Sequence, residues 1–303
     1  MAIVALSFLF SGCSKDDETT PADPTVTITE GTSLAIPANT STATPYSLTL
    51  HVTIDAPGKI KSIVFNRNAY LGETLVTPYT ETITTYNNET TASIDKTDDI
   101  VLGQFHLGTI DKISYEFIIT DVNDVIGEAT FDVTMGSYTA FTSEIITGEI
   151  WKLHSSGKAC WDLKGDSTVT AIGDNYSVKR YIINSDNINS ANIESNFTGS
   201  WTSNSVSWTS AGGTNYVTNG NGIKYVKANS FDYTNAKVEK ANYVFELAGT
   251  TNQLTSIVNP AVDDIYIAKK DAELYVIKIT ELNTTEAAPT KANTGVLRFT
   301  YKK

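Results

Sequence analysis

Residues that build catalytic and metal sites are scarce in this sequence of 303 residues, which has three histidines and two cysteines. His51, His106 and His154 lie far apart, and no His-Glu-x-x-His motif of a zinc protease occurs. The Gly-x-Ser-x-Gly turn of serine hydrolases and a phosphate-binding glycine loop are also missing. We therefore predict a protein that is not an enzyme and has no catalytic residues, no metal site and no cofactor.

Basic residues are in the minority, with 22 Lys and Arg against 34 Asp and Glu and a net charge of -12. Proteins bind the phosphate backbone of nucleic acids chiefly through Lys and Arg. The pairs Lys269–Lys270 and Lys302–Lys303 are isolated and form no basic patch in the sequence. We therefore predict no nucleic-acid partner.

A hydrophobic run long enough to span a membrane is missing as well, because such a helix needs about 20 apolar residues. The apolar stretch at residues 2–10 has the length of the hydrophobic core of a signal peptide. The small residues Ser11 and Gly12 follow it, then Cys13, and then the acidic cluster 14–18. This order of segments is typical of a cleaved and acylated N-terminus.

Residues 9–18, LFSGCSKDDE, resemble the signal of Bacteroidetes-type surface-exposed lipoproteins, in which an acidic export signal follows the acylated cysteine. The resemblance implies a signal peptide at 1–12, lipidation of Cys13 and a flexible tether at 13–24. It also implies a protein of the outer membrane, held there by its lipid anchor and facing the cell exterior. No Lys or Arg precedes the apolar run, so we expect the natural start to lie upstream of Met1.

Acylation of Cys13 leaves Cys160 without an intrachain partner, which excludes a disulfide framework. The fold must then rest on hydrophobic cores. The sequence is 41% hydrophobic and has 15 Tyr, 11 Phe and 4 Trp, which is enough to form them and too aromatic for a disordered chain. We expect Cys160 to be a small buried residue.

Alternating apolar and polar residues predict β-strands across residues 25–135. About seven short strands in about 110 residues are typical of an immunoglobulin-like β-sandwich. The segment resembles the Ig-like or PKD-like modules that follow the tether in such lipoproteins. The clearest strands are expected at 46–54, 113–119 and 129–135.

Residues 136–147 are predicted to form a linker, and residues 148–303 a second β-rich domain with strands, among others, at 264–270, 274–280 and 295–301. One helix is expected, because Val238, Ala241, Asn242, Phe245 and Ala248 recur at helical spacing. Gly249 would end this helix, and Thr234 or Asn235 would cap its start. The predicted fold is therefore mostly β, an Ig-like β-sandwich followed by a second β-rich domain with one packed helix.

Segments 231–241, 262–282 and 295–303 resemble the C-terminal domain of uncharacterised surface lipoproteins of the same type. The resemblance carries no catalytic motif, so it implies fold and location alone.

The tetrapeptide Ser-Trp-Thr-Ser occurs twice, at 200–203 and 207–210. A turn between the two copies would place Trp201 and Trp208 directly opposite each other in a hairpin, near Tyr216. Sugars stack their C–H faces on such rings while hydroxyl and amide groups bind their rims. The alternative is an aromatic pair turned into the core, and in a continuous strand the two rings would lie on opposite faces.

The leading functional prediction is a non-catalytic cell-surface lipoprotein that binds an extracellular ligand, with a glycan as the first choice, at Trp201, Trp208 and Tyr216. One alternative is an adhesion or structural protein whose partner is another surface protein. A second alternative is a glycoside-active enzyme that uses two carboxylates. The candidate carboxylates for that enzyme are Asp162, Asp166, Asp263 and Asp264.

Overall fold

The computed structural model divides the chain into two compact units, and each is described here by itself. The first unit comprises the described parts of Met1–Ala35, Tyr46–Ile100 and Ile110–Thr134, and the second those of Ile36–Pro45, Val101–Thr109 and Met135–Lys303. The structure describes residues 21–38, 45–141, 145–151, 160–168, 181–184, 197–204, 206–209, 215–218, 221–284 and 295–303.

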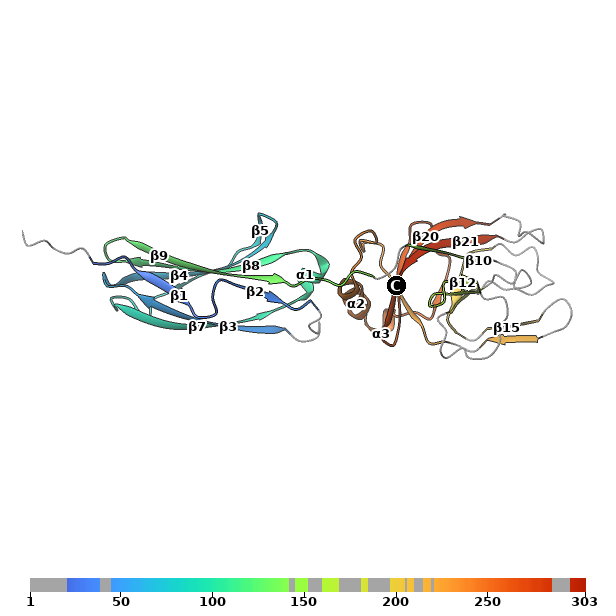
Figure 1. Cartoon of the computed structure of the whole chain (residues 1–303), viewed down its shortest axis with the longest axis horizontal. Helices are drawn as coiled ribbons and strands as arrows, with labels where there is room; N and C mark the ends of the chain where they lie inside the picture. Colours follow the sequence, from blue (N-terminus) through green and yellow to red (C-terminus); the bar gives the residue numbers. More distant parts are fainter. Residues whose placement is uncertain are drawn as a thin grey trace, which may run out of the picture. The chain divides into compact units, whose positions relative to one another are not determined.

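Two antiparallel sheets form the first unit (Figure 1). One sheet has the order β1-β3-β7, with β1 at Thr25–Ile28, β3 at Tyr46–Asp55 and β7 at Thr91–Ile100. The other has the order β2-β9-β8-β4-β5, and β6 also pairs with β4. Its strands are β2 (Ser33–Ile36), β4 (Ile60–Leu71), β5 (Thr74–Thr77), β6 (Thr80–Ile83), β8 (Lys112–Asp121) and β9 (Ile126–Met135).

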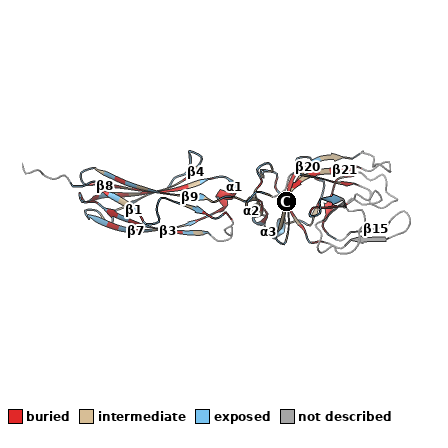
Figure 2. Ribbon diagram, in the orientation of Figure 1, coloured by how far each residue is buried: buried red, intermediate tan, exposed pale blue. Residues whose placement is uncertain are grey.

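Period-2 alternation builds the core of this sandwich, as the sequence predicted. Along β3, Leu48, Leu50, Val52 and Ile54 are buried while the residues between them reach solvent or are half-buried. Figure 2 shows the same alternation of buried and exposed positions in the neighbouring strands. Since successive side chains point to opposite faces of a strand, one face of each sheet is left to pack against the other sheet.

Polar contacts also connect the two sheets. Arg67 of β4 donates from Nε to Asp98 Oδ2 of β7 over 2.6 Å, and the Tyr115 hydroxyl of β8 donates to the same oxygen over 2.5 Å. Lys96 of β7 lies 2.8 Å from Glu81 Oε1 of β6. The half-buried Arg67 and Asp98 thus compensate each other's charge between the sheets.

The turn between β8 and β9 is organised by the buried carboxylate of Asp121. Its Oδ1 accepts the backbone N–H groups of Asn123 and Val125, each over 2.8 Å. Gly58 lies against the same carboxylate, because a Cβ there would stand 2.0 Å from Asp121 Oδ2. The acidic residues of this turn therefore stabilise a hairpin.

The second unit has a central sheet of order β10-β21-β20-β19-β17 and a second sheet of order β12-β11-β13-β14-β18. A further pair, β15 (Val206–Thr209) and β16 (Asn215–Thr218), forms a two-stranded sheet. The central strands are β10 (Ile146–Trp151), β17 (Lys224–Lys227), β19 (Ile265–Lys270), β20 (Glu273–Asn283) and β21 (Val296–Lys302). The second sheet consists of β11 (Cys160–Asp162), β12 (Ser167–Thr168), β13 (Tyr181–Asn184), β14 (Trp201–Thr202) and β18 (Ser256–Ile257).

The central sheet is buried on both faces. Tyr266 and Ala268 of β19 belong to one hydrophobic cluster, which also holds Trp161 and Trp201 of the second sheet. Ile267, the residue between them, belongs to another cluster with helix α2. Alternate side chains of one strand therefore serve two separate cores.

The predicted helix is confirmed as α2, which spans Val238–Leu247. Its N-cap is Lys237, without a side-chain cap, so the predicted caps Thr234 and Asn235 are wrong. Glu239 in the first helical turn instead accepts hydrogen bonds from the backbone and hydroxyl of Thr139. The charge of this carboxylate near the helix N-terminus is favourable.

Two short helices escaped sequence prediction. α1 spans Gly103–Leu107 between β7 and β8, and α3 spans Gly249–Asn252 directly after α2. With five and four residues, both are too short to show a helical period.

Candidate functional site

A pocket of about 330 Å³ lies in the second unit. We call it the Lys164–Glu273 pocket, after the ion pair on its wall. Its apolar lining comes from Phe141, Val238, Leu274 and Tyr275 and its charged lining from Lys164, Glu273 and Lys303, with Ala272 completing it.

Turns and strand ends present the charged groups. Glu273 is the first residue of β20 and follows the tight turn from β19, in which Asp271 has a left-handed backbone with φ of 53°. Lys164 lies in the turn between β11 and β12, and Lys303 directly follows β21. Residues up to 139 positions apart thus meet at one place.

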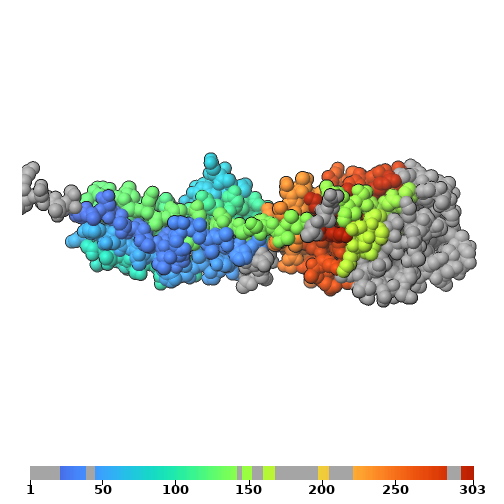
Figure 3. Space-filling view, in the orientation of Figure 1, coloured from blue at the N-terminus to red at the C-terminus, as the bar shows by residue number. Residues whose placement is uncertain are grey.

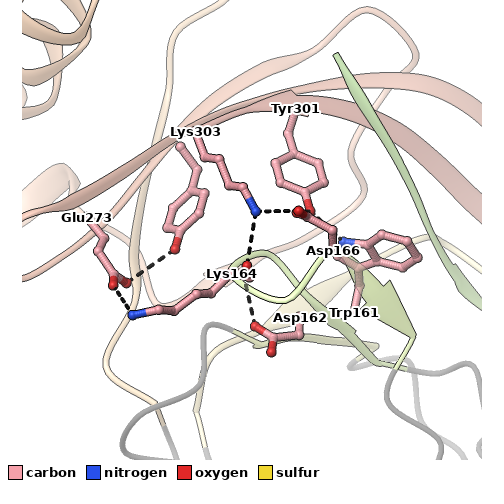
Figure 4. Close-up of polar contacts among 8 residues, drawn as sticks. Trp161, Asp162, Lys164, Asp166, Glu273, Tyr301 and Lys303 are labelled. Atoms are coloured by element: carbon pink, nitrogen blue, oxygen red, sulfur yellow. Dashed lines mark hydrogen bonds and ion pairs between the residues drawn. The ribbon is translucent and has the colours of Figure 1, made fainter. Parts of the chain in front are cut away.

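The first polar group of the pocket is the ion pair of Lys164 and Glu273 (Figure 4). Lys164 Nζ lies 2.5 Å from Glu273 Oε1, and the Tyr275 hydroxyl donates to Glu273 Oε2 over 3.2 Å. The Lys164 side chain is 57% exposed, so its ammonium group stays accessible to solvent. The backbone of Lys164 is held by Asp162, because the Lys164 amide donates to Asp162 Oδ1 over 3.0 Å.

The second polar group is centred on Asp166. Lys303 Nζ forms an ion pair with this carboxylate and donates to the carbonyl oxygen of Lys164 over 3.0 Å. The Tyr301 hydroxyl donates to Asp166, and Trp161 Nε1 donates to the Tyr301 oxygen over 3.1 Å (Figure 4). Burial, together with the charge of Asp166, raises the pKa of Tyr301, so its hydroxyl keeps its proton.

The charges of the pocket therefore balance locally, since each ammonium group has a carboxylate partner. Hydrogen-bond donors and acceptors lie together with apolar side chains in the lining. Such an arrangement suits reversible binding of a small polar molecule with an apolar face. Within the described residues no group of three or more His, Cys, Asp or Glu side chains is placed to hold a metal ion.

Trp201 does not belong to an exposed surface, and its predicted role in ligand binding is wrong. It is 0% exposed and lies edge-on to Tyr225 and Tyr266, with ring centroids 6.0 and 5.1 Å away. Its strand, β14, pairs with β13 and β18. The alternative of a core tryptophan therefore holds for Trp201.

The predicted hairpin between Trp201 and Trp208 is also wrong, because the two residues lie in strands that do not pair with each other. Trp208 is in β15, where it lies directly opposite Tyr216 of β16. Directly opposed positions of an antiparallel pair share one face of the sheet. Two of the three predicted stacking residues are thus paired in register, while their side chains fall outside the described part of the structure.

The four candidate glycosidase carboxylates are held by partners of their own. Asp162 and Asp166 support the pocket as described, and Asp263 forms a 2.9 Å ion pair with Lys278. Burial raises the pKa of Asp264, but hydrogen bonds from the Ala261 amide and from side chains that include Lys227 outweigh it and lower the pKa to about 2. The general acid of a glycosidase needs the opposite shift.

Of the two cysteines, the structure describes Cys160, which does not line the pocket. Cys13 lies outside the described residues, so its lipidation stays a prediction. Cys160 is 2% exposed, as expected, and burial raises the pKa of its thiol to about 12. Within the described residues, no helix is both long and apolar enough to cross a membrane.

Sequence reasoning missed the residues that line the pocket. The sequence pattern places Glu273 in the hairpin turn, Tyr275 in an ordinary strand and Lys303 in an isolated basic pair. Only the sheet order β21-β20 brings the last residues of the chain beside the start of β20. No spacing in the sequence encodes this proximity.

No protein-family model matches the chain, and no curated protein matches it significantly. The functional argument therefore rests on the chemistry of the chain itself.

Proposed function

We propose that this protein is a non-catalytic lipoprotein of the outer-membrane surface that binds an extracellular glycan. In this proposal Cys13 carries the lipid, residues 13–24 are the tether, and the second unit binds the ligand. The observation that carries the binding function is the Lys164–Glu273 pocket, where paired charges lie beside apolar side chains.

Sugars have the matching chemistry. A pyranose ring has an apolar C–H face and a rim of hydroxyl groups, each of which both donates and accepts hydrogen bonds. Phe141, Leu274 and Tyr275 supply apolar surface, and Lys164 and Glu273 supply a donor and an acceptor side by side. At about 330 Å³ the pocket is near the lower end of the usual range for ligand sites, which suits one end of an oligosaccharide.

We also propose Trp208 and Tyr216, which occupy opposed positions of β15 and β16, as a second place where sugar rings stack. We keep them in the proposal as an extension of the binding surface. Their substitution by Ala tests this extension independently of the pocket.

A glycan array probed with the full chain tests the proposed function. We expect binding to be lost in the Lys164→Met/Glu273→Gln double variant, whose fold is checked by circular dichroism. The matched control is Lys278→Met/Asp263→Asn, which removes another surface ion pair of the same unit and leaves binding intact. If the protein bound none of the glycans on the array, the proposal would be contradicted.

The lipid anchor has a test of its own. Metabolic labelling with a palmitate analogue is expected to mark the wild-type protein and the Cys160→Ser control, but not Cys13→Ser. Protease treatment of intact cells then reports whether the protein faces the exterior. Equal labelling of Cys13→Ser and wild type would refute acylation at Cys13.

A second candidate function is adhesion to a protein partner, and one feature of the first unit favours it. The hairpin of β4 and β5 projects from the surface (Figure 3) and carries Leu71, Leu75 and Val76, and Tyr79 follows β5. These four side chains are 45–50% exposed. Clustered exposed apolar side chains often mark an interaction site. Cell adhesion that falls in Leu75→Ser/Val76→Ser but not in the pocket variant would favour this function over glycan binding.

A further inference from the structure

The charges around the Lys164–Glu273 pocket indicate whether its ligand is neutral, anionic or cationic. Lys164 is neutralised by Glu273 and Lys303 by Asp166. Asp162 adds one more carboxylate behind the Lys164 backbone. The two lysines of the lining are thus matched by Glu273 within the lining and by Asp166 beside it, so the charged groups at the site contribute no positive excess, in a chain whose net charge is -12.

An anionic ligand is disfavoured at such a site. Glu273 and Asp166 already neutralise the two ammonium groups, so the carboxylate or sulfate of such a ligand would meet no net positive charge. The anionic group would also lie close to these two carboxylates, and like charges at short distance repel each other. A cationic ligand is disfavoured as well, because Glu273 and Asp166, the two carboxylates that could bind it, each already form an ion pair with a lysine.

A neutral hydroxyl group avoids both difficulties. It can donate to Glu273 and accept from Lys164 without separating them, since the two charged atoms lie only 2.5 Å apart. The Lys164 ammonium has three N–H groups, and within the described residues its contact is with Glu273 alone. Donors therefore remain for the ligand.

The apolar wall adds a second requirement. Phe141, Val238 and Leu274 are half-buried beside the ion pair, and Tyr275 is buried beneath it. A ligand must present a C–H face to this wall and adjacent hydroxyl groups to the ion pair. A neutral sugar ring combines the two.

We propose that the Lys164–Glu273 pocket selects neutral sugars over acidic and amino sugars, with the intact ion pair binding adjacent hydroxyl groups. This inference rests on the proposed glycan-binding function and specifies the ligand class of the same site. Lys164 and Glu273 are its specificity-determining residues, and Lys303 and Asp166 position the turn that carries Lys164.

Calorimetric titration of the full chain with matched sugars tests the inference. The probes are methyl glucoside, methyl glucuronide and glucosamine, together with the corresponding galactose series, so that members of a set differ mainly in charge. We expect the neutral member of at least one series to bind about tenfold more tightly than its charged counterparts. Lys164→Met and Glu273→Gln should each weaken that binding about tenfold, since each removes a charge-assisted hydrogen bond.

The outcomes separate the inference from the function on which it rests. Tighter binding of the glucuronide or of glucosamine, abolished by the pocket variants, would overturn neutral selection and leave glycan binding standing. Neutral binding that the pocket variants do not change would overturn the site assignment. No binding in calorimetry or on the glycan array would overturn both.

Discussion

Asp264 is buried at the start of β19, where four donors surround its carboxylate. Oδ2 accepts hydrogen bonds from Lys227 Nζ over 2.8 Å and from the Tyr266 hydroxyl and the Ala261 amide, both over 2.9 Å. Oδ1 accepts from Asn229 Nδ2 over 2.8 Å. A charged carboxylate with this many donors is expected to contribute strongly to stability.

The shift in the pKa of Asp264 gives the size of this contribution to folding stability. Burial alone would raise the pKa of Asp264, but the surrounding donors outweigh it, and the pKa falls from 3.8 to about 2. At 1.36 kcal/mol per pKa unit, this fall corresponds to about 2 kcal/mol of folding free energy. Because the folded pKa lies below the unfolded one, the contribution is complete above about pH 4 and is lost as the pH falls toward 2.

Replacing the carboxylate with an amide tests this reasoning. We expect Asp264→Asn to lower the free energy of unfolding at neutral pH by about 2–4 kcal/mol, because an NH2 group then faces Lys227 and Tyr266. The matched control is Asp263→Asn, whose side chain is 77% exposed in its ion pair with Lys278. It should lose less than about 1 kcal/mol.

Urea unfolding followed by circular dichroism between about pH 3 and 7 measures both quantities. The Asp264→Asn variant should lose part of the wild-type decline in stability toward acid, in addition to its lower stability at neutral pH. The role given to these hydrogen bonds would be refuted if the two variants lost equal free energy of unfolding. It would also be refuted if the stability of Asp264→Asn declined toward acid pH as steeply as that of the wild type.

Three further predictions concern other buried sites. Trp201→Ala should lower the free energy of unfolding by about 3–5 kcal/mol, measured by urea unfolding, because the ring fills the core between the sheets; a loss below about 1 kcal/mol would contradict core packing. His106 is 3% exposed against Tyr243, and burial lowers its pKa, so stability should decline as pH falls below about 6.5. His106→Phe should reduce that decline in denaturation measured at about pH 5 and 7.5, and an unchanged decline would show that another group titrates. Gly58→Ala should cost about 1–3 kcal/mol in thermal unfolding, since its Cβ would collide with the Asp121 carboxylate, and an unchanged melting temperature would refute this close approach.

Much of the mostly β fold could be predicted from local pattern. The alternation in β3, β8 and β9 identified those strands because one face of each is buried and the other is more exposed. β5 escaped because all four of its residues are exposed, so no apolar period marks it. The helix α2 was found from its apolar spacing, although its cap was misplaced because Lys237 provides no side-chain signal.

The candidate site could not be predicted in the same way. Trp201 and Trp208 are close in sequence, and proximity suggested a hairpin, but sheet order assigns them to different sheets. Conversely, Lys164 and Glu273 are 109 positions apart and meet only because the start of β20 lies near the turn that follows β11. Long-range strand pairing carries this information, and a single sequence does not display it.

The division of the chain into compact units does not follow its linear order. The second unit includes Ile36–Pro45 and Val101–Thr109, two segments that precede the strands β3 and β8 of the first. A truncated protein that starts at Met135 would therefore lack part of its own unit, including α1 and His106, which stacks on Tyr243. A fragment that keeps the second unit whole has to begin at or before Ile36, and it then carries the strands of the first unit that lie between these segments in the sequence.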